Sequence, residues 1–331
     1  MSFIVQLNQN KSFFIDQGLT LLKGAEKAGV TIPYSCRNGR CSSCKCKLIR
    51  GRTQAIYDEY GLSVEEKREG WILSCVRTAC SDIELTAEDL EGIVLPDALT
   101  LPARIHSLEK LAPDVLRVML RLPPSVEFNF IPGQYIDVIG NGGIRRSYSL
   151  ACAHAVDKHL ELHIRAIVGG AMSQYWFEQA RINDLLRLNG PLGTFFVRET
   201  QGIDLVFLAT GTGYGPVKAM LESLAILPSD QQPNSITVIW GGRAKVDLYL
   251  TLPPLPVKHR FVPVLSRAGD DWTGSRGYVQ DVFLSMQTDL ANAVVYACGS
   301  EAMIQGAKST LTSAGLPVEN FHSDAFVCSA F

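Results

Sequence analysis

Residues 36–44 read C-R-N-G-R-C-S-S-C, and the later string W-I-L-S-C ends at a further cysteine, Cys75. Four residues separate Cys36 from Cys41, and two separate Cys41 from Cys44. A tight loop therefore supplies three thiols, and a distant segment brings the fourth. In a reducing compartment, cysteines clustered in this way indicate metal binding or redox chemistry more often than disulfides.

The spacing C-x4-C-x2-C…C is typical of plant-type [2Fe–2S] ferredoxins. Two irons and two sulfides need four thiolates that converge from one side, which this pattern provides. The small residues Gly39, Ser42 and Ser43 leave room for backbone N–H groups to approach the sulfurs and tune the potential. We therefore predict a [2Fe–2S] cluster with these four ligands: Cys36, Cys41, Cys44 and Cys75.

A structural zinc site is the main alternative, because such sites usually combine two short cysteine pairs. Cys41 and Cys44 together with Cys75 and Cys80 form a conceivable set of this kind. A Rieske centre needs two histidine ligands, and the sequence has no C-x-H pair. The surplus cysteines are expected to be buried or incidental thiols: Cys46, Cys80, Cys152 and Cys328.

The composition describes an ordinary globular chain of 331 residues, with 47% hydrophobic and 19% charged residues. This length predicts two or three domains, and the apolar content excludes general disorder. A net charge of −2 gives no global footprint for nucleic acid. No apolar run approaches the ~18–20 residues that span a bilayer, and the first residues lack the pattern of a secretory signal, so we do not expect one. We expect a cytoplasmic protein with no nucleic-acid or membrane partner.

The N-terminal region, residues 1–91, is expected to be an α+β domain of the β-grasp ferredoxin type. Residues 2–8 and 12–16 have the pattern of a strand pair, and 19–29 that of a short helix before the cysteine loop. Residues 92–101 contain Pro96 and follow an acidic stretch, so we expect a linker there.

Basic residues surround the cysteine loop. Between residues 36 and 52 there are six basic side chains and no acid. They can form a docking face for a partner protein, or simply a solvated surface, and the sequence favours neither. The six are Arg37, Arg40, Lys45, Lys47, Arg50 and Arg52.

The middle region, residues 102–200, alternates apolar and polar residues with a period of two. Examples are D-V-L-R-V-M-L-R-L at 114–122 and H-L-E-L-H-I-R-A-I at 159–167. Turn signals such as P-P at 123–124 separate these runs. Many short strands divided by turns predict an antiparallel β-barrel.

The string R-S-Y-S at 146–149 resembles the flavin motif of the ferredoxin–NADP reductase superfamily. This resemblance implies a FAD site to which Arg146, Ser147, Tyr148 and Ser149 contribute. Tyr148 would offer an aromatic face to the isoalloxazine ring, and Arg146 would pair with the pyrophosphate. Ser149 would donate a hydrogen bond near flavin N5, which makes it a candidate catalytic residue.

A second segment of the barrel has the features of a phosphate site. The string G-G-A-M-S at 169–173 precedes a helix-like run, and glycine backbone with a serine at a helix start suits a phosphate group. We therefore expect FAD contacts from Gly169, Gly170, Met172 and Ser173. His163 and Arg165 share one face of a strand that borders the flavin in the family, although a solvent-side position for His163 fits equally well.

The last region, residues 201–331, has the pattern of an α/β doubly wound NAD(P)-binding domain. An apolar run at 203–210 predicts a buried parallel strand, and G-T-G-Y-G-P at 211–216 then leads into a helical stretch. A strand, a glycine-rich turn and a helix place a pyrophosphate at a helix N-terminus. The turn is neither G-x-G-x-x-G nor a P-loop, but it resembles the superfamily's G-T-G-x-x-P turn. The nucleotide contacts expected here are Gly211, Thr212, Gly213 and Pro216.

Further candidates follow later strands of the same predicted sheet, where parallel sheets bind ligands. They are Arg243, Ser266, Arg267, Cys298 and Gly299. The Cys-Gly pair resembles the dipeptide beside the nicotinamide in the superfamily, so Cys298 is a candidate catalytic residue; a buried thiol is the alternative. A Ser-Arg pair can bind a 2′-phosphate and favour NADPH, whereas the family resemblance favours NADH.

The order of ferredoxin, flavin barrel and nucleotide sheet resembles the iron–sulfur flavoprotein reductases over nearly the whole chain. Members of this family serve aromatic-ring oxygenases, and others drive the 3-deoxygenation of CDP-sugars. Strings such as V-Y-A-C-G-S-E-A-M-I at 295–304 and F-H-S-D-A-F-V at 321–327 are closer to the sugar enzymes. The second string places Phe326 where the family has an aromatic residue near the flavin, so Phe326 is the third candidate catalytic residue.

The resemblance implies an NAD(P)H-dependent electron-transfer enzyme that uses FAD and a [2Fe–2S] cluster, with NADH as the expected donor and NADPH as a possible one. The electron-accepting partner would dock near the cluster. It would be a CDP-4-keto-6-deoxyhexose 3-dehydrase or, as the alternative, the oxygenase component of an aromatic-ring oxygenase. A third hypothesis, a zinc-stabilised binding module without catalysis, does not account for three cofactor motifs in a workable order.

Overall fold

The computed structural model describes residues 2–327, which fall into two compact units. The N-terminal unit runs to Val94 and also contains the short segment Gly193–Phe195. The C-terminal unit contains the rest of the described chain. Cys328, one of the surplus cysteines, lies outside the described residues. Within residues 2–327, no helix has both the length and the apolar character needed to cross a bilayer.

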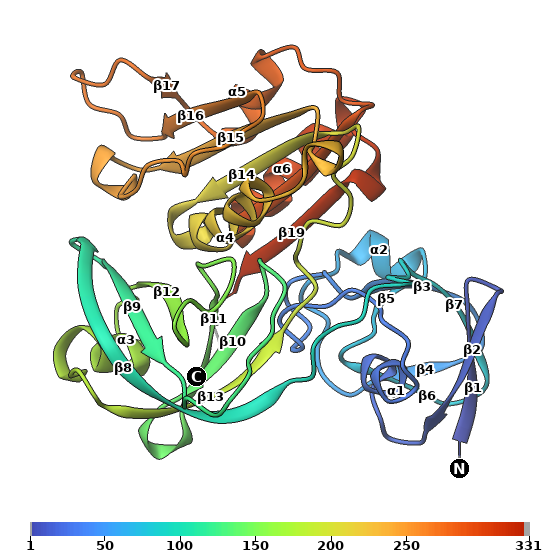
Figure 1. The fold of residues 1–331 in the computed structure, drawn as a ribbon. Coiled ribbons are helices and arrows are strands. Elements are labelled where there is room, and N and C mark those ends of the chain that lie inside the picture. Colours follow the sequence, from blue (N-terminus) through green and yellow to red (C-terminus); the bar gives the residue numbers. More distant parts are fainter. Residues whose placement is uncertain (1, 328–331) are drawn as a thin grey trace. The chain divides into compact units, whose positions relative to one another are not determined.

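The N-terminal unit is built on a mixed five-stranded sheet in the order β2-β1-β7-β3-β5, which Figure 1 shows in blue and cyan. Alternation in the first two strands buries Val5, Leu7, Phe13 and Ile15 on one face. The strand pair and the helix predicted for this region are confirmed. The elements are β1 (Ser2–Leu7), β2 (Lys11–Asp16), α1 (Leu21–Lys27), β3 (Lys45–Arg50), β4 (Thr53–Ala55), α2 (Val64–Arg68), β5 (Trp71–Leu73), β6 (Arg77–Ala79) and β7 (Ile83–Thr86).

The segment Gly193–Phe195 completes the N-terminal unit although it lies a hundred residues further along the chain. The backbone N–H of Tyr34 donates to Thr194 Oγ1 at 2.8 Å, and the backbone N–H of Thr194 donates to the Tyr34 carbonyl at 3.1 Å. Both residues are buried. The stretch that leads into the cysteine loop is therefore held by a distant piece of the sequence.

The first half of the C-terminal unit is a six-stranded antiparallel sheet in the order β11-β10-β13-β8-β9-β12. A bridge between Leu150 and Leu162 joins the two edges, so the sheet closes into the predicted barrel. Strand β8 starts at Leu99, inside the expected linker. The elements are β8 (Leu99–Ala112), β9 (Val115–Arg121), β10 (Tyr135–Ile139), β11 (Arg145–Ser149), β12 (His159–Arg165), α3 (Ala171–Gln174), which a π-helical turn (Tyr175–Gln179) extends, and β13 (Leu185–Leu192).

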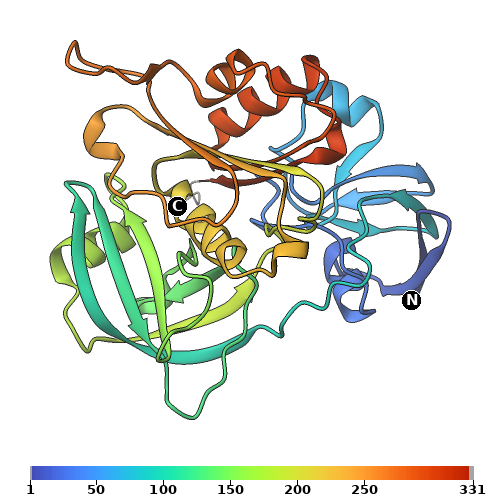
Figure 2. The ribbon, with the colours of Figure 1, turned by 45° about the horizontal axis from the view of Figure 1, so that its top comes forward.

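The second half of the unit is a parallel sheet in the order β17-β16-β15-β14-β18-β19. Helix α4 covers the face toward the barrel, and α5 and α6 pack together on the other face (Figures 1 and 2). This is the predicted doubly wound fold, with its switch point between β14 and β18. The elements are β14 (Asp204–Thr210), α4 (Tyr214–Ala225), β15 (Ser235–Gly242), β16 (His259–Leu265), β17 (Ser275–Arg276), α5 (Val279–Ser285), β18 (Ala293–Ser300), α6 (Glu301–Ser313) and β19 (Phe321–Phe326).

Candidate functional site

The four predicted cluster ligands lie together as two pairs in the N-terminal unit. The backbone N–H of Cys41 donates to Cys36 Sγ at 3.3 Å, and that of Cys36 donates to Cys41 Sγ at 3.4 Å. Cys75 is the neighbour that acts most strongly on Cys44, and together with burial it raises the pKa of the Cys44 thiol. A hydrogen bond from Cys41, helped by backbone N–H groups of the loop, lowers the pKa of Cys36 to about 6 against the effect of burial.

The loop conformation explains how the backbone reaches the sulfurs. Arg37, Gly39 and Ser42 all have positive φ angles, at 55°, 77° and 62°. Two of these residues are not glycine, which is uncommon and marks a loop held in place by its surroundings. A Cβ at Gly39 would lie 2.4 Å from the carbonyl oxygen of Asp58, so this position requires glycine.

This arrangement fits a [2Fe–2S] cluster better than a zinc ion. Among residues 2–327, no group of three or more sulfur, imidazole or carboxylate ligands surrounds a single position suited to one metal ion. Zinc needs four ligands around one ion, whereas each iron of a [2Fe–2S] cluster takes two thiolates. Cys80, which the zinc alternative requires, is exposed at the end of β6. The two pairs would hold the two irons.

Part of the basic charge around the cluster loop is already paired. Arg37 forms an ion pair with Glu26, and Lys45 Nζ lies 2.7 Å from Glu66 Oε1. Lys45 and Lys47 also lie over the ring of Trp71, at 4.5 and 5.4 Å from its centroid. Arg50 and Arg52 are exposed and keep their charge toward solvent. The face is therefore less basic than the sequence alone implies.

In the C-terminal unit, the flavin motif forms β11 and pairs with β10 at the barrel edge. Asp137 on β10 binds two neighbours: it accepts a hydrogen bond from Ser147 Oγ at 2.6 Å and lies 3.2 Å from Arg145 Nη1. Arg146 has no carboxylate partner among the described residues, and its Nη1 donates to a backbone carbonyl at 2.8 Å. Its guanidinium is therefore available to bind an anion.

Tyr148 is held in a fixed orientation next to this arginine. Trp176 Nε1 donates to the Tyr148 hydroxyl at 2.9 Å, and the two rings meet edge to face. Burial raises the pKa of Tyr148 to about 12, so its hydroxyl stays neutral. Ser149, the last residue of β11, is half-buried. An oriented ring beside an unpaired guanidinium fits the stacking and pyrophosphate roles expected for FAD.

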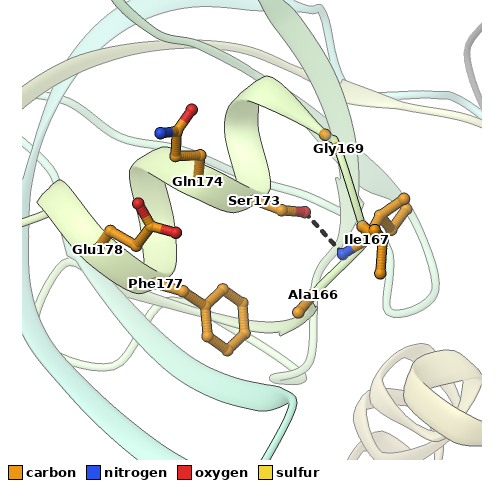
Figure 3. Close-up of a pocket in the computed structure, with 9 residues that line it drawn as sticks. Ala166, Ile167, Gly169, Ser173, Gln174, Phe177 and Glu178 are labelled. Carbon is orange, nitrogen blue, oxygen red and sulfur yellow. Dashed lines mark hydrogen bonds between the residues drawn. The ribbon is translucent and has the colours of Figure 1, made fainter.

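The expected phosphate segment lines a cavity of 290 Å³ on the barrel, which Figure 3 shows in close-up. Its wall includes Gly169, Gly170 and Ser173, and Phe177 and Glu178 lie across it. Ser173 Oγ accepts a hydrogen bond from the backbone N–H of Ile167 at 2.9 Å. The serine side chain therefore stabilises its own loop. Met172 instead packs into the barrel core.

His163 and Arg165 both bind groups of the protein itself. The His163 ring lies 2.9 Å from Glu161 Oε1 and 3.3 Å from the Tyr249 hydroxyl. Its side chain is 1% exposed, which rules out the solvent-side alternative, and burial lowers its pKa, so the ring stays neutral. Arg165 forms ion pairs with Asp114 and Asp247.

The glycine-rich turn after β14 lies against the end of β18. A Cβ at Gly213 would lie 2.2 Å from the carbonyl oxygen of Cys298, and one at Gly299 would lie 2.1 Å from Thr210 Oγ1. Only glycine permits this close approach. Thr212 within the turn and Pro216 in the first turn of α4 are both buried. The Cys298 thiol is fully buried, which raises its pKa, so it is a neutral thiol rather than a thiolate.

The remaining nucleotide candidates lie at the carboxyl ends of the strands. The backbone N–H of Ser266 donates to Gly242 at 2.9 Å, and that of Arg267 donates to Arg243 at 3.0 Å, which makes the two arginines neighbours. Both are exposed, and neither pairs with a carboxylate in the described chain. Phe326 lies across from Ser300 at the end of β19, with 39% of its surface exposed.

Sequence reasoning did not find several residues that complete this region. Trp176 orients Tyr148, Tyr249 binds His163, and Asp247 binds Arg165. Trp240 Nε1 donates to the Gly211 carbonyl at 3.0 Å and supports the nucleotide turn. A signal existed for Trp240, because it precedes the Gly-Gly pair of a predicted strand. Trp176 lies in the helix-like run after residues 169–173, where nothing marks it, and Asp247 and Tyr249 lie outside any local motif.

Comparison with known proteins covers all three regions. Family models described as a 2Fe-2S iron-sulfur cluster binding domain, an oxidoreductase FAD-binding domain and an oxidoreductase NAD-binding domain match residues 5–80, 102–197 and 207–309. The chain is 39% identical to the CDP-6-deoxy-L-threo-D-glycero-4-hexulose-3-dehydrase reductase of Yersinia pestis, over 99% of this chain and 100% of that protein.

Two further similarities are to a dioxygenase reductase component and to a solved cytochrome P450 reductase structure. Reductase component 2 of the terephthalate 1,2-dioxygenase from a Comamonas species is 30% identical, over 93% of this chain and 92% of its own. The crystal structure of an Amycolatopsis cytochrome P450 reductase matches with a TM-score of 0.74 and 28% identity, over 98% of both chains.

Proposed function

Because this chain belongs to the iron–sulfur flavoprotein reductases, we propose that it passes electrons from NADH to a separate CDP-4-keto-6-deoxyhexose 3-dehydrase. The single observation that carries this choice is the full-length identity with a hexulose-3-dehydrase reductase, which exceeds that with the dioxygenase component. The same three regions in the same order also occur in oxygenase reductases, so an oxygenase partner remains the second candidate.

Different residues of the C-terminal unit would bind the flavin and the nucleotide. When bound, FAD and the cluster supply the conversion of an electron pair into single electrons. Arg146 would bind the FAD pyrophosphate, and Tyr148 would cover one face of the flavin ring. The turn at Gly211–Gly213 would receive the nucleotide pyrophosphate. The neutral Cys298 thiol would border the nicotinamide without acting as a base or nucleophile.

The partner would dock beside the cluster loop. Tyr57 and Tyr60 are 71% and 65% exposed. Their segment packs on that loop, because the backbone N–H of Gly61 donates to the Gly39 carbonyl at 2.9 Å. Exposed aromatic residues are enriched where proteins bind each other. Arg50 and Arg52 are exposed on the same unit and add positive charge to it.

The paired arginines at the strand ends lead to a prediction about the nucleotide. NADPH should be accepted as well as NADH, because Arg243 and Arg267 can bind a 2′-phosphate. Arg267→Ala should lower kcat/KM for NADPH about tenfold, the worth of one charge-assisted contact of ~1.5 kcal/mol, and change that for NADH less than about twofold. Steady-state ferricyanide reduction with each nucleotide measures both values. Equal losses for the two nucleotides would remove Arg267 from the 2′-phosphate site.

A coupled assay tests the proposed partner. NADH oxidation is followed anaerobically with a purified CDP-hexulose 3-dehydrase, with and without CDP-4-keto-6-deoxyglucose. The proposal predicts NADH consumption that requires both the dehydrase and the sugar, and a 3-deoxy product. Rapid cytochrome c reduction without coupled turnover would retain the reductase and favour an oxygenase partner instead.

A further inference from the structure

The Arg165 side chain bridges the two cofactor-binding halves of the C-terminal unit. It extends from β12 of the barrel, where its Nε donates to Asp114 Oδ2 at 2.7 Å. Its Nη2 forms an ion pair with Asp247, which follows β15 of the parallel sheet. Its Nη1 lies against the nucleotide turn, because a Cβ built at Gly211 would lie 2.6 Å from this atom.

Asp247 connects Arg165 to a second turn at the carboxyl edge of the parallel sheet. The nucleotide is expected to bind at this edge, which we call the nucleotide edge. Its Oδ2 accepts hydrogen bonds from the backbone N–H groups of Arg243 at 2.7 Å and Ala244 at 3.0 Å. Burial opposes its charge, but these bonds and the guanidinium of Arg165 outweigh burial and lower the pKa of Asp247. Only 10% of the Asp247 side chain is exposed, whereas the Arg165 side chain keeps 31% of its surface exposed, so the ion pair is partly buried.

Arg165 thus touches both turns that flank the expected nucleotide site, the turn at Gly211 and the one at Arg243. With two carboxylates already bound to it, its charge is committed to the protein. A guanidinium held in this way has little freedom to bind a cofactor directly, although the sequence made Arg165 a cofactor-binding candidate on a strand that borders the flavin. Its geometry suits the alignment of one half against the other.

We propose that Arg165 is a positioning residue that aligns the nucleotide edge of the parallel sheet with the FAD barrel during flavin reduction by NADH. The proposal rests on the proposed use of NADH and FAD but not on the identity of the partner enzyme. Electron transfer from a nicotinamide requires close contact between groups bound by the two halves. A misplacement of about 1 Å can cost about a hundredfold in rate.

Other contacts across the same boundary keep the unit assembled without Arg165. Lys218 on α4 donates to the Ala151 carbonyl at 2.8 Å and to Glu161 Oε2 at 3.0 Å. The backbone N–H of Ala153 donates to Glu222 Oε2 at 3.1 Å. Asp247 also keeps its bonds to its own turn when Arg165 is removed. Variants at position 165 should therefore fold and retain FAD.

The test is anaerobic stopped-flow reduction of FAD-loaded Arg165→Ala by NADH, without any partner protein. The limiting rate of flavin reduction should fall at least about tenfold, while the half-saturating NADH concentration changes less than about threefold. Arg165→Lys keeps the positive charge but loses the planar guanidinium that binds two carboxylates at once. It should recover part of the rate. Arg104→Ala removes an exposed arginine of β8 whose Nη1 donates to the Asn183 carbonyl, away from β12, and should leave the rate unchanged.

A second readout needs neither cofactor nor turnover. In Arg165→Ala, amide hydrogen exchange should become faster in peptides that cover residues 243–249, and Arg104→Ala should show no such change. Asp247→Asn serves as a second variant and should lower the limiting rate in the same direction. An unchanged limiting rate in Arg165→Ala would overturn the proposal, and so would loss of FAD, which would assign Arg165 to the flavin. Wild-type protein that NADH does not reduce would contradict the proposed function instead.

Discussion

Cys41→Ser is expected to abolish the visible absorption of the iron–sulfur cluster and electron delivery to the partner enzyme. Cys41 pairs with Cys36, so its loss leaves one iron with a single thiolate. Substitutions in the shell around the ligands alone lower metal affinity or activity about 10- to 100-fold. The loss of a ligand itself should therefore lower the rate of partner reduction at least about a hundredfold. Visible spectra and the coupled assay measure the two effects.

The same variant should keep its reduction of ferricyanide by NADH. The FAD and nucleotide residues belong to the C-terminal unit, whereas Cys41 belongs to the N-terminal unit. Cys80→Ser makes the same chemical change at an exposed cysteine and is the matched control. It should leave the cluster bands intact. If Cys80→Ser erased the bands, the ligand set would have to be redrawn; loss of ferricyanide reduction in folded Cys41→Ser would refute the separation of the two centres.

Tyr148→Ala should release FAD during gel filtration. The substitution removes an aromatic face whose stacking against a planar base is worth about 1–3 kcal/mol in other proteins, or about 5- to 100-fold in FAD affinity. Tyr148→Phe keeps the ring and removes only the hydroxyl that accepts from Trp176. If stacking holds the flavin, the phenylalanine variant should retain most of its FAD.

Flavin fluorescence of the protein after gel filtration gives the FAD content of both variants. Equal FAD loss from Tyr148→Ala and Tyr148→Phe would assign the effect to the hydroxyl rather than to the ring. Full retention by Tyr148→Ala would remove Tyr148 from the flavin site. Circular dichroism of each variant separates FAD loss from unfolding, since Tyr148 packs against the barrel core.

The features that the sequence predicts well depend on short stretches. Three cysteines of the cluster lie within nine residues, and the turn after β14 combines a buried strand with close glycines. Strand alternation likewise predicts the barrel, because side chains two residues apart face the same side. In the cysteine loop, the turn and the strands, residues close in sequence are also close in space, so the local pattern predicts the contacts.

The environment of β12 shows why other features could not be predicted. The sequence places His163 and Arg165 on one face of a strand but does not say what covers that face. The structure covers it with Lys218, Asp247 and Tyr249, which come from more than fifty residues further along. No pattern connects these residues, because their proximity depends on how the parallel sheet packs against the barrel.

The composition of the N-terminal unit has a practical consequence for anyone who exchanges redox modules between such reductases. A gene fragment cut after residue 94 omits Gly193–Phe195, and with it the residue that satisfies the backbone N–H and carbonyl of Tyr34. Tyr34 stands two positions before Cys36. A transplanted ferredoxin module would therefore need a matching threonine at the equivalent of Thr194 in its host. A compatible graft carries two separate pieces of sequence, and a junction chosen from linear boundaries alone would leave the entry to the cysteine loop unsupported.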